Sequence, residues 1–121
     1  MPRTDLTPQS PPGPYPGTIA ADGADITFTA GDSVNNNAVV LTGDKKELVI
    51  VRNDNVAAQT ISIISTPDSF KRTGDITDYS IGPSEYAVFG PFALEGWRQS
   101  DGKLYIDPQS ADVKIAVIKL P

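Results

Sequence analysis

The sequence predicts an all-β protein: an antiparallel β-sandwich or small barrel of about eight strands with an extended proline-rich N-terminal arm. Three observations support this fold class. Short apolar runs, several of them alternating with polar residues, recur about every 8–12 residues along the chain. The residues between these runs are mostly Gly, Pro, Asn, Asp and Ser, which favour turns. No window of about ten residues or more has the apolar period of roughly 3.6 that an amphipathic helix requires.

The N-terminal arm is predicted to comprise residues 1–17, and the β-sandwich body residues 18–121. Six of the 11 prolines lie within the arm. Because proline fixes φ and has no N–H donor, this stretch suits neither a helix nor a central strand. We therefore expect an extended, polyproline-like segment with a reach of about 50 Å, at about 3.1 Å per residue.

The first half of the body is predicted to contain four strands. Residues 26–29 alternate apolar and polar side chains with the period of two that marks a half-buried strand. The runs at 38–41 and 47–51 are short and apolar, and the turn-forming sequence at 42–45 separates them. Residues 59–65 alternate again, so they are expected to form the fourth strand.

The second half of the body begins with a polar loop at 71–78 and continues with short strands. Five more strands are expected, at residues 78–81, 85–89, 97–99, 103–106 and 113–120. The sequence Ser-Asp-Gly at 100–102 predicts a hairpin turn between two of them, because Gly readily takes the positive φ that such turns need.

The last predicted strand, 113–120, becomes apolar on both faces toward its C-terminal end. A central strand has this pattern, and so has a strand whose outer face is covered by another subunit or by the arm. We take Ile118 and Leu120 as candidate partner contacts on the body. The arm supplies four more candidate contacts, two charged and two apolar: Arg3, Asp5, Leu6 and Tyr15.

The overall charge limits the kinds of partner. The 121-residue chain has the length of one domain, and its 15 acidic and 10 basic side chains give a net charge of −5. This charge argues against nucleic acid and against an anionic membrane surface as partners, because both favour basic patches. The longest apolar runs are four or five residues, far below the roughly 18 of a membrane-spanning helix.

The composition also removes most catalytic chemistry. The chain has no Cys and no His, which excludes disulfides, Cys/His zinc sites, thiolate nucleophiles and nucleophile–His pairs. The three glutamates, Glu47, Glu85 and Glu95, lie near strand ends or turns, where a solvated carboxylate is ordinary, and most aspartates occupy turn sequences. We therefore expect a protein without enzymatic activity, catalytic residues, cofactor or bound metal.

Two segments, 82–92 (GPSEYAVFGPF) and 96–105 (GWRQSDGKLY), resemble small structural proteins encoded in the morphogenesis clusters of tailed phages and prophages. The two strands between residues 47 and 65 fit the same pattern, so the similarity spans roughly residues 47–120. The resemblance implies a virion protein and, within that class, a capsid decoration (cement) protein. Such proteins bind the outside of an icosahedral shell, often as trimers, and clamp neighbouring major capsid subunits.

The resemblance also implies location and partners. The chain would be made in the host cytoplasm and would lie on the capsid exterior of the virion. Its partners would be the major capsid protein or another virion protein, and it would form a homo-oligomer, with a trimer favoured.

Two alternatives remain open. A head–tail joining protein or a tail component of the same particle has a similar size and fold. From another class, a carbohydrate-binding β-sandwich module is a candidate, because six of the nine aromatic residues fall within residues 79–105. A coplanar, exposed aromatic set that includes Trp97 would favour sugar binding, whereas buried aromatic residues would favour a protein clamp.

Overall fold

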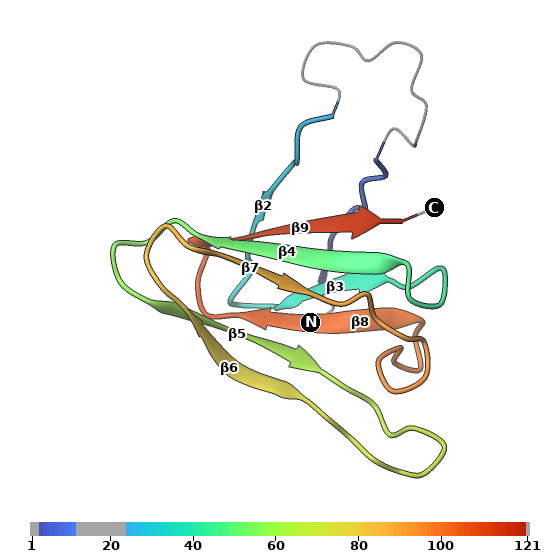
Figure 1. The fold of residues 1–121 in the computed structure, drawn as a ribbon. Helices are drawn as coiled ribbons and strands as arrows, with labels where there is room; N and C mark the ends of the chain where they lie inside the picture. The colour runs from blue at the N-terminus through green and yellow to red at the C-terminus, as the bar shows by residue number, and fades with distance from the viewer. Residues whose placement is uncertain (1–2, 12–23, 121) are drawn as a thin grey trace.

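The computed structural model describes residues 3–11 and 24–120 of the chain. These residues form nine strands and no helix (Figure 1). The strands are β1 (Thr4–Asp5), β2 (Thr29–Ala30), β3 (Asn37–Val40), β4 (Glu47–Asn53), β5 (Gln59–Ile64), β6 (Ile76–Ile81), β7 (Tyr86–Phe89), β8 (Lys103–Pro108) and β9 (Val113–Lys119). They make two open sheets, so the predicted all-β sandwich is confirmed and, among the described strands, no sheet closes into a barrel.

The strand order is that of a jelly roll. One sheet has the order β2-β9-β4-β7 and the other the order β1-β3-β8-β5-β6. Strands β2 to β9 pair antiparallel throughout and form two facing four-stranded sets, which is the jelly-roll arrangement. β1 adds a short parallel strand beside β3. Because most connections cross between the sheets, the loops gather at the two ends of the sandwich (Figure 1).

The core lies between the two sheets and follows the alternation seen in the sequence. Every second residue of β4 and β5 is buried, and the same holds for β8. Burial of each Val, Leu or Ile side chain contributes about 1.5–3 kcal/mol relative to an exposed position. The fully buried aliphatic residues include Val39, Val49, Val51, Ile63, Leu104, Ile106 and Val113.

β9 corresponds to the last predicted strand. It lies between β2 and β4, so the interpretation as a central strand is confirmed. β2 covers only the start of this edge, opposite Lys114 and Ile115. Farther along, Gln9 pairs with the same edge of β9. Its N–H donates to the carbonyl oxygen of Val117 at 2.8 Å, and its carbonyl accepts from Lys119 N–H at 2.7 Å.

The N-terminal segment therefore joins both sheets. Thr4 N–H donates to the Asn36 carbonyl and Leu6 N–H to the Ala38 carbonyl, at 2.9 and 2.7 Å, on the five-stranded sheet. Three residues later, Gln9 pairs with β9 of the other sheet. The described start of the predicted arm thus packs on the body, while the predicted boundary at residue 17 lies outside the described residues.

Two predicted strands differ from the structure. Of residues 26–29, only Thr29 lies in a strand, β2. Residues 97–99 lie in no strand: a turn at residues 95–97 ends there, and Arg98 N–H donates to the Leu94 carbonyl at 3.0 Å. Trp97 packs against the core from this turn, so its apolar character reflects burial in a connection and not in a sheet. The turn predicted at residues 100–102 is present, but it leads into β8 and does not join two strands: Gly102 has a φ of 83° and donates its N–H to Gln99 O at 2.9 Å.

Candidate interaction surface

The outer face of the five-stranded sheet carries two ion pairs, beside the exposed Val40 and the half-buried Ile64. Arg3 forms an ion pair with Asp107, and its guanidinium carbon lies 4.1 Å from the ring centre of Tyr105. The Lys103 ammonium lies 2.8 Å from an Asp5 carboxylate oxygen, and this hydrogen bond raises the pKa of Lys103. These contacts pair the charges of β1 and β8 with one another within the chain.

The arm residues singled out from the sequence are placed as follows. Arg3 and Asp5 form the ion pairs just described, with side chains of β8. Leu6 is 6% exposed and belongs to the core. Tyr15 lies outside the described residues. The structure therefore brings three of the four predicted arm contacts together, against the body of the same chain.

The two predicted contacts on the body lie near the end of β9. Ile118 is half-buried on the outer face of the four-stranded sheet, opposite Leu48 of β4. Leu120 is also half-buried and follows the strand, and its N–H donates to the Lys46 carbonyl at 2.6 Å. Both residues therefore belong to one continuous surface.

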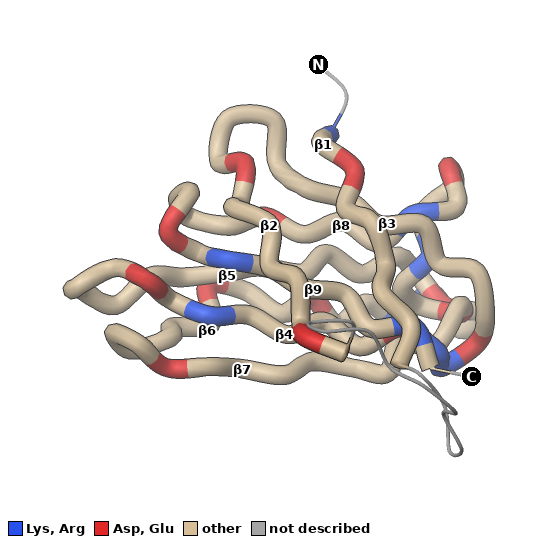
Figure 2. The backbone as a smooth tube through the Cα atoms, turned by 90° about the horizontal axis from the view of Figure 1, so that it is seen from above, with Lys and Arg blue, Asp and Glu red and all other residues tan. Residues whose placement is uncertain are grey.

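The outer face of the four-stranded sheet is mostly apolar, and it has no ion pairs between its strands like those that join β1 to β8 on the other sheet. We call the following residues the apolar face: Phe28, Leu48, Ile50, Tyr86, Val88, Ala116 and Ile118. In the register of the sheet, Ile50 lies between Ala116 on β9 and Val88 on β7. Val88 is 61% exposed and Tyr86 63%, and β7 carries no charged residue (Figure 2). Ala116 is 2% exposed, and Phe28, Leu48, Ile50 and Ile118 are half-buried. A contiguous apolar surface of this kind marks an interaction site.

One end of the apolar face is bordered by two basic residues, Arg52 and Lys114, which lie opposite each other on β4 and β9. Arg52 Nε donates to Asp54 Oδ1 at 2.7 Å, and its guanidinium carbon lies 4.4 Å from the ring centre of Phe28. Phe28 in turn meets Tyr86 edge-on, with ring centres 6.2 Å apart. These contacts hold the aromatic side chains of the face in a defined geometry.

The aromatic residues do not form the platform expected of a sugar-binding module. Trp97 is half-buried and meets the buried Phe92 edge-on, with ring centres 5.0 Å apart. Tyr79 and Phe89 are perpendicular, at an angle of 90°. Among the described residues, all three close aromatic pairs are edge-on, and none is coplanar.

Carboxylates organise the connection between β5 and β6, at one end of the sandwich. Asp75 accepts hydrogen bonds from the Ser65 hydroxyl and N–H, at 2.6 and 2.7 Å, and these bonds lower the pKa of Asp75. Asp68 accepts from the N–H groups of Arg72 and Phe70, which lowers its pKa as well. The connection is thus ordered by local bonds, although Phe70 itself is 76% exposed.

Sequence reasoning missed most of the apolar face. It identified Ile118 but not Tyr86, Val88 or Phe28. A signal was available, because the runs at 47–51 and 85–89 carry apolar residues on both faces, as the run at 113–120 does. The three runs become one surface only through the pairing of β4 with β7 and β9, which no local pattern reveals.

The described residues contain no group of three or more His, Cys, Asp or Glu side chains that could hold a metal ion. In the same part of the chain there is no helix long and apolar enough to cross a membrane. Comparison with protein families, with curated proteins and with solved structures finds no match to this chain.

Proposed function

We propose that this chain is a non-enzymatic structural protein of a tailed-phage-like particle, a capsid decoration protein that binds neighbouring major capsid subunits through its apolar face. The observation that supports this proposal is the contrast between the two outer faces. One face pairs its charges internally, and the other leaves Tyr86 and Val88 exposed beside Ile50. A rigid sheet face that presents contiguous apolar residues suits attachment to a larger assembly.

A rigid sheet face is well suited to such attachment. Its side chains are held by strand pairing and by the Arg52–Phe28–Tyr86 contacts, so docking orders few new groups. Apolar area removed from water contributes about 25 cal/mol per Å² before the cost of association is subtracted. Because the chain would bind the assembled shell and not its separate subunits, many bound copies would stabilise the shell by mass action.

The resemblance and the strand order are both compatible with a particle protein. The resemblance of residues 47–120 to phage structural proteins supports the particle class, and the jelly-roll order is one that viral capsid domains use. Lectins use the same order, so the fold alone does not decide the function. The proposal assigns docking to the apolar face and not to residues 3–9, since these residues already bind the body of their own chain. A head–tail joining or tail component would use the same face on a different partner.

The test is binding to heads that are assembled without this chain from the other structural proteins of the particle. Purified protein is added, the heads are sedimented, and the bound fraction is measured at several protein concentrations. We expect saturable binding by the unaltered chain. Val88→Asp is expected to raise the dissociation constant at least about tenfold, because it places a charge within the apolar face.

The matched control is Val56→Asp. Val56 is 95% exposed in the connection between β4 and β5, so the variant makes the same chemical change away from the apolar face. Its binding should equal that of the unaltered chain. Equal binding by both variants would remove the apolar face from the proposal, and no binding by the unaltered chain would refute decoration. Binding to isolated tails or connectors instead of heads would select the alternative position in the particle.

A further inference from the structure

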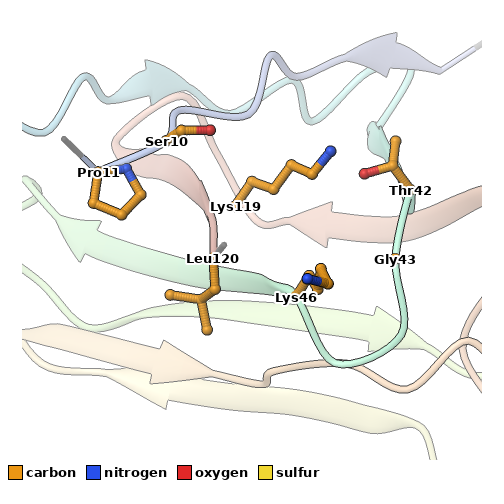
Figure 3. Close-up of a pocket in the computed structure, with 7 residues that line it drawn as sticks. All are labelled: Ser10, Pro11, Thr42, Gly43, Lys46, Lys119 and Leu120. Atoms are coloured by element: carbon orange, nitrogen blue, oxygen red, sulfur yellow. The ribbon is translucent and has the colours of Figure 1, made fainter. Parts of the chain in front are cut away.

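A depression of about 520 Å³ lies at the end of the sandwich where β9 ends and β4 begins. It is lined by Ser10, Pro11, Thr42, Gly43, Lys46, Lys119 and Leu120 (Figure 3). Figure 3 shows the Lys119 side chain extending across the depression toward Thr42. Lys46 lies beside the start of β4, below Lys119 in this view. The depression therefore gathers two lysines and two hydroxyl groups.

Hydrogen bonds hold the β3–β4 turn that forms one wall of the depression. Glu47 is fully buried, and its Oε1 accepts hydrogen bonds from the N–H groups of Thr42 and Gly43, at 3.0 and 3.3 Å. Lys45 N–H donates to the Phe92 carbonyl at 2.9 Å, which ties the same turn to the β7–β8 connection. The turn is thus a preformed support for the two lysines, and only their side chains need to adjust to a ligand.

Lys46 is further positioned by its contact with Gly43. A Cβ atom at Gly43 would lie 2.7 Å from Lys46 Cδ, so the aliphatic part of the lysine rests where a side chain would otherwise stand. Leu120 N–H donates to the Lys46 carbonyl at 2.6 Å, and this pair extends the sheet by one residue beyond the pair Glu47 and Lys119. The depression is therefore continuous with the apolar face.

The charges in the depression are unusual for this chain. The net charge is −5, and the described ion pairs involve Arg3, Arg52, Arg72 and Lys103. Within residues 3–11 and 24–120, neither Lys46 nor Lys119 forms an ion pair. Two ammonium groups beside two hydroxyls, all facing one recess, provide the donors that a small oxyanion accepts.

We infer that this depression binds a carboxylate group, and that the carboxylate is supplied by an acidic side chain of the protein on which the apolar face docks. The source of the carboxylate rests on the proposed function, whereas the binding site itself does not. A protein carboxylate fits better than phosphate, because the two nearby backbone N–H groups that could cradle phosphate are already bonded to Glu47. Glu47 also offsets part of the positive charge, so the affinity for a lone carboxylate is expected to be weak.

The test uses sodium acetate as the probe and backbone amide NMR shifts as the readout, with ionic strength held constant by chloride. The intact chain should show saturable shifts at Thr42, Gly43 and Lys119, with a dissociation constant on the order of millimolar. The double variant Lys46→Gln/Lys119→Gln should lose saturation. Lys45→Gln removes the same charge from a neighbouring residue that does not line the depression, and it should titrate like the intact chain.

Three results would overturn the inference: shifts that rise linearly with acetate, an unaltered titration of the double variant, or saturation with inorganic phosphate but not with acetate. The acetate titration needs no particle, so it is decided whether or not the chain binds heads. On heads, the double variant should weaken binding about threefold or more, as expected for loss of a desolvated charge pair. Unchanged binding to heads, with acetate binding lost, would refute the docking partner as the source of the carboxylate.

Discussion

Glu47 and Lys119 lie opposite each other in the register of β4 and β9, yet among the described ion pairs there is none between them. The Glu47 carboxylate is turned to the backbone of the β3–β4 turn instead, where Oε1 accepts two N–H bonds. Its other oxygen, Oε2, is buried and has no hydrogen-bond partner among the described residues. Glu47 therefore stabilises the β3–β4 turn, and the Lys119 ammonium group remains able to bind a ligand in the depression.

This arrangement predicts different effects for two substitutions of Glu47. Glu47→Ala removes the acceptor of two N–H groups and leaves a cavity, so we expect a loss of about 2–4 kcal/mol in the free energy of unfolding. Glu47→Gln retains the acceptor oxygen, so its loss should be at least about 1 kcal/mol smaller. Urea unfolding followed by Trp97 fluorescence measures both, since Trp97 is the single tryptophan and is half-buried. Equal losses would contradict the role given to Oε1.

The docking of the N-terminal segment predicts that Leu6 contributes to stability. Leu6 is 6% exposed and packs in the core, so Leu6→Ala should reduce the free energy of unfolding by about 2–4 kcal/mol. Thr7→Ala changes the next residue, which is exposed, and should alter it by no more than about 0.5 kcal/mol. If both variants unfolded at the urea concentration of the intact chain, residues 3–9 would not be part of the folded body in solution.

The carboxylate of Asp75 predicts how the β5–β6 connection responds to acid. Its pKa in the folded protein is lowered from 3.8 by the Ser65 hydroxyl and N–H. The stabilising bond is therefore fully present above pH 3.8 and is lost as the pH falls through the lower, folded value. We expect the Ser65 and Gly74 amides to remain protected from hydrogen exchange at pH 5 and to lose protection only in stronger acid.

Asp75→Asn provides the matched comparison for this prediction. The amide keeps an acceptor oxygen but has no charge, so exchange at Ser65 should be faster at pH 5 and should no longer depend on titration at this position. Ala38 N–H, in the five-stranded sheet, should be unaffected in the same spectra. If acid released the Ser65 amide equally in both proteins, another group would control the connection.

The sequence was sufficient for the strands whose side chains alternate within a regular sheet. β4 and β5 were predicted close to their observed bounds, because Val49, Val51, Ile61 and Ile63 are buried at every second position. β1 was not predicted, since two residues between prolines carry no period, and the strand forms only because β3 offers an edge. The apolar face required the long-range pairing of β4 with β9, which local sequence cannot specify.

Two glycines predict opposite outcomes for the same substitution. A Cβ at Gly31 would lie 2.8 Å from Pro108 Cβ and from the Val113 carbonyl oxygen, so Gly31→Ala must displace the chain between β2 and β3. We expect a loss of about 1–3 kcal/mol in the free energy of unfolding. Gly74 has open space around its Cα, so Gly74→Ala should change stability by no more than about 0.5 kcal/mol.

Gly31→Ala should also affect the apolar face. Gly31 N–H donates to Val113 O at 2.9 Å and anchors the end of β2, and Phe28 lies just before this strand. Displacement of Gly31 should therefore loosen the contact of Phe28 with Arg52 and Tyr86 and weaken binding to heads under conditions where the variant is still folded. Unaltered amide shifts at Tyr86 together with unaltered head binding would show that the apolar face does not depend on this close approach.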